Sequence, residues 1–259
     1  MDSVFPKKNL TIWMLPILFL VIQCLPEYVG LGIALALLLL TIFLKCLRKA
    51  SLFLLLSVCS YFAWFFISPL ILSALDNPML ESTLERFALV GYIIIFAIWN
   101  HFSKMEVSYL FIGSSKETIR FPLIWQGRKE PIWRFILIFC CICLAPFFIG
   151  VVVNKPTAAI LGFGFLFSIV NALLEEIIWR GFILSRAVSL VGEKQALLIT
   201  ALTFGLYHIS LGFPIWACLI FSIGGLYMGG TAIMSKGLFA PFIMHVFVNM
   251  IFVVFGMII

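Results

Sequence analysis

Long apolar runs separated by short polar gaps constrain the fold of this chain most strongly. A helix needs about 20 mainly apolar residues to cross the hydrocarbon core of a bilayer. Apolar side chains make up 64% of the 259 residues and charged ones only 11%, whereas a soluble domain has about 25% charged residues. The runs are too continuous for the short alternating strands of a membrane β-barrel. We therefore predict an integral, multi-pass membrane protein with an all-α fold, a polytopic transmembrane helical bundle.

The candidate spans are the apolar runs 10–26, 29–44, 51–75, 87–103, 132–153, 158–184, 196–211, 214–234 and 238–258. The first two are short for a full crossing and are separated by only three residues, so they fit either two spans or a hairpin near the surface. We expect about eight spans, within a range of seven to nine. The polar gap from Ser103 to Pro131 divides the chain into N-terminal membrane helices, residues 1–130, and a C-terminal core, residues 131–259.

The formal net charge is +6, and the basic residues lie in the gaps between apolar runs. Lys7 and Lys8 precede the first run, whereas the gap before residue 87 is mainly acidic and includes Asp76. Cytoplasmic loops of membrane proteins carry an excess of Lys and Arg, so this pattern predicts a cytoplasmic N-terminus. The scattered basic residues give no sign of a nucleic-acid partner, and the expected surroundings are the lipid bilayer.

Two adjacent acids, Glu175 and Glu176, lie inside the apolar run 158–184. A charged side chain at the centre of a membrane helix costs about 2.5–3.5 kcal/mol, so the pair needs a role. Residues four apart share a helix face, so Glu176 and Arg180 are expected to form an ion pair that mainly supports the structure. Consecutive residues point about 100° apart, so Glu175 faces elsewhere and has no local cation.

Polar residues also interrupt the later apolar runs. His208 lies in one run, and His245 and Asn249 lie four residues apart in the last one. Buried polar groups need partners, and these groups are each other's most accessible partners. We therefore expect them to meet Glu175 in an intramembrane polar cavity.

Together these residues form a complete set for hydrolysing a peptide bond without a covalent intermediate. Glu175 is placed to take a proton from water as a general base, and His208 to orient that water or move the proton. His245 and the Asn249 amide are placed to donate hydrogen bonds to the oxyanion of a tetrahedral intermediate.

Three motifs in this order, Glu-Glu-x-x-x-Arg, Phe-x-x-x-His and His-x-x-x-Asn, each lie on a separate run. This arrangement resembles the CPBP family of intramembrane glutamate proteases, which includes CAAX prenyl proteases of the Rce1 type, Abi proteins and bacteriocin self-immunity proteins. The resemblance covers roughly residues 131–259. Trp179 stands where the family more often has Phe, which should alter packing rather than chemistry.

The resemblance implies a helical bundle with a membrane cavity that usually opens toward the cytoplasmic side, here in the bacterial cytoplasmic membrane. By position it implies that Glu175 activates water beside His208 and that His245 and Asn249 form the oxyanion site. It further implies that Glu176 and Arg180 support the site. The implied activity is that of a CAAX-type glutamic endopeptidase, with no cofactor and no metal.

Two other functions remain open at this stage. Glu175, His208 and His245 form a two-histidine, one-carboxylate set that a metal-dependent hydrolase could use. A scaffold or bacteriocin-immunity protein could keep the polar cluster only for packing. The expected partner of the enzyme is a membrane-embedded or lipid-anchored protein or peptide. Prenylated C-termini, peptide pheromones and bacteriocins all remain possible substrates.

Overall fold

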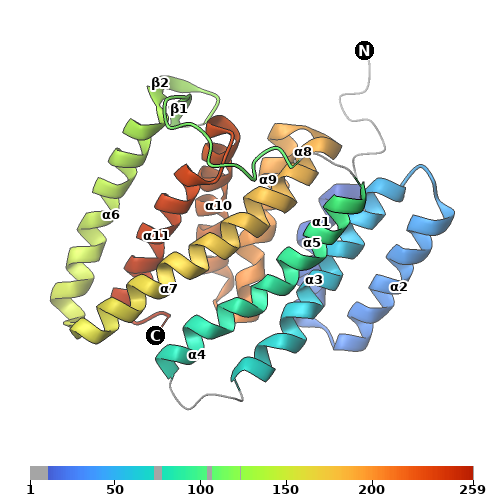
Figure 1. Ribbon diagram of the computed structural model, residues 1–259, viewed down its shortest axis with the longest axis horizontal. Coiled ribbons are helices and arrows are strands. Elements are labelled where there is room, and N and C mark those ends of the chain that lie inside the picture. The colour runs from blue at the N-terminus through green and yellow to red at the C-terminus, as the bar shows by residue number, and fades with distance from the viewer. Residues whose placement is uncertain (1–10, 73–77, 104–106, 123, 259) are drawn as a thin grey trace.

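The computed structural model describes residues 11–72, 78–103, 107–122 and 124–258, which form an all-α bundle with one small hairpin (Figure 1). The fold class agrees with the prediction from the sequence. Lys7, Lys8 and Asp76, which contribute to the predicted orientation, lie outside the described residues.

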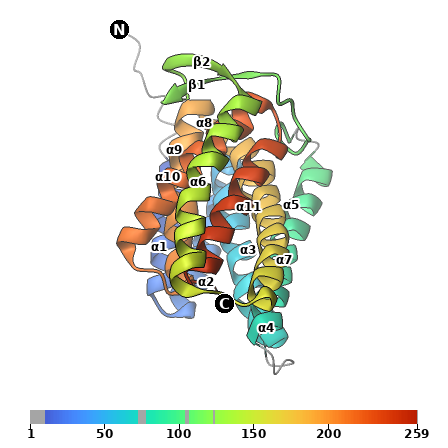
Figure 2. The ribbon, with the colours of Figure 1, turned by 90° about the vertical axis from the view of Figure 1, so that its left-hand side faces the viewer.

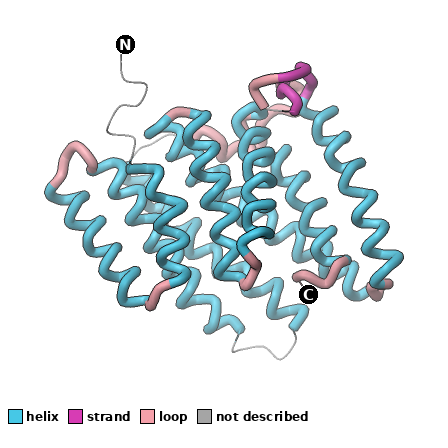
Figure 3. Tube along the Cα trace, turned by 180° about the vertical axis from the view of Figure 1, so that it is seen from behind, coloured by secondary structure: helices cyan, strands magenta, loops and turns pink. Residues whose placement is uncertain are grey.

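Successive helices run back and forth between two ends of the bundle, where the loops gather (Figure 3). The α-helices are α1 (Met14–Cys24), α2 (Glu27–Phe43), α3 (Arg48–Leu72), α4 (Pro78–Glu85), α5 (Val90–Ser103), α6 (Ile132–Asn154), α7 (Ala158–Glu176), α8 (Ser185–Val191), α9 (Glu193–Tyr207), α10 (Ile215–Ser235) and α11 (Phe239–Val254). Shorter segments of other helix types include η2 (Arg86–Leu89), η3 (Ile177–Leu184) and η4 (His208–Leu211).

Five helices among the described residues are long and apolar enough to cross a membrane: Arg48–Ile71, Leu80–Ser103, Ile132–Asn154, Ala158–Val191 and Ile215–Ser235. Three shorter apolar helices accompany them: Thr11–Cys24, Glu27–Phe43 and Phe239–Val254. The chain is therefore an integral membrane protein. The number of crossings, about eight, stays a prediction.

Two predicted runs differ from the helices that form. The run 158–184 continues through α8 to Val191 as one long helix. The run beginning at residue 87 extends back through η2 to α4, so its helical path starts at Pro78. The polar residues just before this apolar run are therefore helical and belong to the bundle.

The polar gap contains a small antiparallel hairpin, which the sequence did not reveal. Strand β1 (Thr118–Pro122) pairs with β2 (Gly127–Pro131), with Thr118 opposite Pro131. The hairpin covers the end of the bundle near α8 (Figure 2). The buried side chain of Ile124, at its tip, packs directly on Gly230 of α10, where a Cβ atom would collide with it.

The loop before the hairpin is joined to the α10–α11 turn by backbone contacts. Ser114 N–H donates to the Ser235 carbonyl at 2.8 Å. Gly113 has φ +80°, and an added Cβ there would lie 2.8 Å from the Cα of Gly237. Only glycine fits such a close backbone approach with positive φ. This link fixes the turn that leads into α11.

Helices α9 and α10 pack backbone to backbone through glycines. A Cβ on Gly205 would collide with Ser222 and the Cys218 carbonyl, and one on Gly225 would lie 3.2 Å from the Cα of Ala201. Gly224 has open space at its Cβ position and needs no such contact. Small residues allow this approach between membrane helices. The approach fixes the end of α9 that carries His208.

Candidate active site

The two acids lie at the end of α7, where the helix changes type. Thr157 caps the start of α7 by accepting a hydrogen bond from Ile160 N–H at 3.2 Å. After Glu176 the chain continues as the π-helix η3. Such wide turns are rare and often occur at functional sites. Glu175 is 2% exposed and Glu176 is fully buried, so both carboxylates need partners inside the protein.

Glu176 contacts two cationic or polar groups through a single oxygen. Arg180 Nη1 donates to Glu176 Oε1 at 2.8 Å, which is the ion pair expected from the four-residue spacing. His245 Nδ1 lies 2.7 Å from the same oxygen. The contact with His245 was not predicted. Glu176 therefore holds the last helix as well as its own.

Glu175 faces the other nitrogen of the same imidazole. His245 Nε2 lies 3.6 Å from Glu175 Oε2, too far for a direct hydrogen bond. A polar contact of this length has room for a bridging water nearby. The imidazole thus lies between the two acids and is closer to Glu176.

His208 begins the short turn η4 after α9. Its Nδ1 lies 2.8 Å from the Phe204 carbonyl, an acceptor, so Nδ1 carries the hydrogen and Nε2 is left for a ligand. Ser210 N–H in the same turn donates to Gln23 Oε1 of α1 at 2.8 Å. A helix far away in the sequence therefore helps to fix the turn that carries His208.

Phe204 packs at the centre of this arrangement. Its ring centroid lies 5.0 Å from that of His208 and 6.0 Å from that of His245. The Arg180 guanidinium lies 4.6 Å from the same ring. Trp179 also packs on Phe204, at 5.5 Å between centroids. Trp179 thus contributes to packing, as the resemblance implies.

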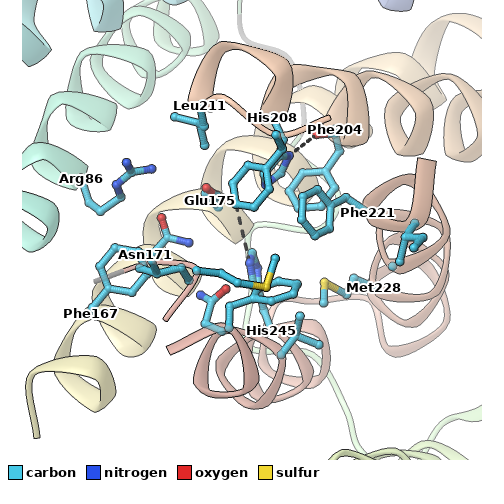
Figure 4. Close-up of a pocket in the computed structure, with 18 of the residues that line it drawn as sticks. Arg86, Phe167, Asn171, Glu175, Phe204, His208, Leu211, Phe221, Met228 and His245 are labelled. Atoms are coloured by element: carbon cyan, nitrogen blue, oxygen red, sulfur yellow. Dashed lines mark hydrogen bonds and ion pairs between the residues drawn. The ribbon is translucent and has the colours of Figure 1, made fainter. Parts of the chain in front are cut away.

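A cavity of about 570 Å³ brings the predicted site residues together (Figure 4). Its lining includes the four residues expected to be catalytic: Glu175, His208, His245 and Asn249. Glu176 and Arg180 do not line it, which agrees with a supporting position behind the site. Most other lining residues are apolar, including Phe139, Phe221 and Phe252.

Several buried polar atoms around this cavity have no hydrogen-bond partner among the described residues: Asn171 Oδ1, Glu175 Oε2 and Asn249 Nδ2. Their residues come from two helices, α7 and α11, and all three line the cavity. A buried polar group without a partner costs about 1–3 kcal/mol. Donor and acceptor atoms left open in one cavity indicate a site for a polar ligand.

Arg86 is the main cavity residue that the sequence reasoning missed. It lies in the polar gap before residue 87 and was not among the predicted site residues, but it is 8% exposed and lines the cavity with Glu85 and Trp64. Its guanidinium lies 5.8 Å from the Phe167 ring centroid. Its position directly before an apolar run could have indicated its burial. A helix that begins a few residues before the run carries Arg86 into the bundle.

The cavity lining reaches the end of the bundle formed by α4 and the C-terminal residues Met257 and Ile258. The hairpin and α8 lie at the opposite end (Figures 1 and 2). Lys194 and Lys236 follow α8 and α10, at the hairpin end. The resemblance implies an opening on the cytoplasmic side, whereas the positive-inside rule predicts that the hairpin end is the cytoplasmic one. These two expectations therefore disagree.

Among the described residues, no three His, Cys, Asp or Glu side chains form a group suited to holding a metal ion. This holds for Glu175, His208 and His245, of which the Glu175 and His245 side chains approach to 3.6 Å.

The fold and the site define an integral membrane protein with a buried acid–histidine cluster in its interior. Residues 157–251 match the family described as type II CAAX prenyl endopeptidase Rce1-like. This segment contains all three motifs, and over these residues the chain is similar to the Rce1-like family that the motifs suggested. No curated protein and no solved structure matches the chain.

Proposed function

We propose that the protein is an intramembrane endopeptidase that hydrolyses a peptide bond with a glutamate-activated water. The observation that carries this proposal is the meeting of Glu175, His208, His245 and Asn249 in one cavity whose polar atoms lack partners. The match to a family of CAAX prenyl endopeptidases supports the same activity.

In the proposed reaction, the Glu175 carboxylate takes a proton from water as the oxygen attacks the carbonyl carbon of the substrate. A tetrahedral intermediate forms, and its oxyanion accepts hydrogen bonds from Asn249 Nδ2–H and His245 Nε2–H. The protonated Glu175 then gives its proton to the leaving nitrogen as the C–N bond breaks. The nitrogen leaves as an amine, and Glu175 is again a carboxylate.

Glu176 and His208 have positioning roles in this scheme. His245 Nδ1 lies 2.7 Å from Glu176, so the carboxylate accepts that hydrogen and stabilises an imidazolium whose Nε2–H points to the site. His208 is held by the Phe204 carbonyl through Nδ1. Its Nε2 can then accept a hydrogen from the attacking water and orient it.

The lining supports an apolar, membrane-associated substrate. Beyond the polar groups the cavity is bounded by Phe139 of α6 and by Ile220, Ile223 and Tyr227 of α10. Ile220 and Ile223 are also more than half exposed. In the proposed function, a membrane-embedded or lipid-anchored peptide approaches Glu175 along this apolar wall of the cavity.

The test compares wild type with Glu175→Gln, which keeps the size of the side chain but removes the base. Purified protein in lipid vesicles is incubated with a peptide carrying an S-farnesylated cysteine and with an unmodified apolar peptide, and products are identified by mass spectrometry. Cleavage by wild type and loss of at least about 10²-fold in the variant are expected. Equal cleavage by both would remove Glu175 from the chemistry.

The same assay separates the two alternatives. Loss of activity on adding a chelator, and recovery with one divalent metal, would favour a metal-dependent hydrolase over the water-activation scheme. A scaffold or immunity protein would show no cleavage, and Glu175→Gln would keep full function in cells.

A further inference from the structure

We propose that Arg86 binds the C-terminal carboxylate of the substrate, so that the cavity selects peptides by their free carboxyl end. The inference rests on the proposed peptidase function and adds a specificity-determining residue from outside the matched segment 157–251.

Arg86 is buried and incompletely paired. Its side chain is 10% exposed, and its buried Nε atom has no hydrogen-bond partner in the described part of the chain. Its Nη2 donates to Glu85 Oε2 at 3.1 Å. The other oxygen of Glu85 accepts from Ser68 at 2.6 Å, so this carboxylate serves two donors. A guanidinium has five N–H donors, so most of the donors of Arg86 remain available for an anion.

The position of Arg86 suits one end of an extended peptide. Its side chain points into the cavity on the side of Asn171 and Phe167, while Phe221 and Met228 lie on the other side of Glu175 (Figure 4). A peptide that places its apolar part among the α10 residues and its scissile bond at Glu175 would direct its C-terminal end toward Arg86.

A carboxylate is the anion that fits this site best. Arginine pairs with planar carboxylates through parallel N–H···O bonds, and such bonds are strong where water is excluded. A buried guanidinium that lacks part of its hydrogen bonding is costly to keep. Binding a carboxylate would satisfy the open Nε–H and add a charge opposite to that of Arg86.

The first experiment measures cleavage of two versions of the same farnesylated peptide, one with a free C-terminus and one with a C-terminal amide. Wild type should cleave the free acid with a kcat/KM about 10- to 100-fold higher, mainly through KM. Arg86→Gln should lose this preference, and Arg86→Lys should restore part of it. Equal cleavage of both peptides by wild type, or an unchanged preference in Arg86→Gln, would overturn the proposal.

The second experiment does not depend on cleavage. Binding of both peptides to Glu175→Gln, with and without Arg86→Gln, is measured by tryptophan fluorescence in vesicles. The free acid should bind more tightly only when Arg86 is present. The control is Arg186→Gln, another buried arginine, which lies over Trp99 and does not line the cavity. It should keep the preference for the free acid.

The two experiments distinguish failure of this proposal from failure of the peptidase function. Carboxylate-dependent binding without cleavage would support Arg86 as an anion site and would contradict the proposed peptidase activity. Cleavage that does not depend on the carboxylate would support the peptidase function and overturn the proposed role of Arg86. Absence of a difference in binding between acid and amide counts against Arg86 in the same way.

Discussion

Nδ1 of His245 lies 2.7 Å from Oε1 of Glu176, the oxygen that also accepts from Arg180. Glu176 is therefore shared between an ion pair within its own helix and an imidazole from the last helix. The same imidazole turns Nε2 toward Glu175 at 3.6 Å. The adjacent acids thus face opposite nitrogens of one imidazole ring. We therefore expect replacement of Glu175 and replacement of Glu176 to have different effects on activity.

Replacing Glu176 by Gln should reduce kcat while leaving KM nearly unchanged. The amide oxygen can still accept from His245, but it no longer stabilises the charged imidazolium that donates to the oxyanion. A loss of about 10- to 100-fold is expected, smaller than that of Glu175→Gln. Steady-state kinetics of both variants give the comparison. A larger loss for Glu176→Gln than for Glu175→Gln would reverse the roles assigned to the two acids.

Replacing both members of the Glu176–Arg180 pair should separate stability from activity. Glu176→Leu alone leaves Arg180 as a buried charge without its carboxylate, which costs about 3–5 kcal/mol. Adding Arg180→Leu should recover much of that loss, because no unpaired charge remains. Activity should stay low in the double variant, since His245 has lost its acceptor. Thermal unfolding and peptide cleavage measured on the same samples test both statements.

Asn249→Ala should lower kcat by about 10²–10³-fold, the usual loss when one oxyanion donor is removed. The fold should survive, because Asn249 Nδ2 makes no hydrogen bond to any residue that the structure describes. Asn249→Asp keeps the shape but replaces the donor by an acceptor, so it should be no more active than the alanine variant. Near-normal turnover in either variant would mean that the oxyanion lies elsewhere.

Gly205→Ala should destabilise the bundle, whereas Gly224→Ala should not. A Cβ on Gly205 collides with Ser222 and the Cys218 carbonyl, so α9 and α10 must separate; at Gly224 the space is open. Overpacking of this kind costs about 1–3 kcal/mol. Thermal unfolding of the two variants in the same detergent provides a matched pair. Equal melting temperatures would mean that the α9–α10 contact is looser than described.

Cysteine labelling should show which side the cavity faces. Leu211 follows α9 at the end of the bundle opposite α8, and it lines the cavity. In a variant without native cysteines, Leu211→Cys should react in intact cells with a membrane-impermeant maleimide. Lys194→Cys, at the basic end, should react only after lysis. If Lys194→Cys reacts in intact cells and Leu211→Cys reacts only after lysis, the cavity faces the cytoplasm, as the family resemblance implies.

The parts of the site that the sequence predicted are those set by spacing along one helix. Glu176 and Arg180 are four residues apart, and one turn of helix is enough to pair them. The contact between His245 and Glu176 joins residues 69 positions apart. It depends on how α7 and α11 rotate and approach each other, which apolar periodicity does not specify.

Arg86 and the hairpin were missed for different physical reasons. The apolar pattern marks where a span is hydrophobic but not where its helix begins, so α4 and η2 were assigned to a gap. The residues of β1 and β2 include Pro, Gly and several charges, which disfavour strands when considered alone. Their pairing relies on Ile124 packing against α10, a tertiary contact.

The cavity takes side chains from both halves of the chain. Trp64, Glu85 and Arg86 come from the N-terminal helices, and Gln23 holds the turn of His208 through Ser210. The family match begins only at residue 157. A protein truncated to residues 131–259 would keep every proposed catalytic group but would lose one wall of the cavity. We therefore expect related sequences that share the three motifs but differ in their first helices to accept different substrates, because the N-terminal half lines part of the cavity but supplies none of the proposed catalytic groups.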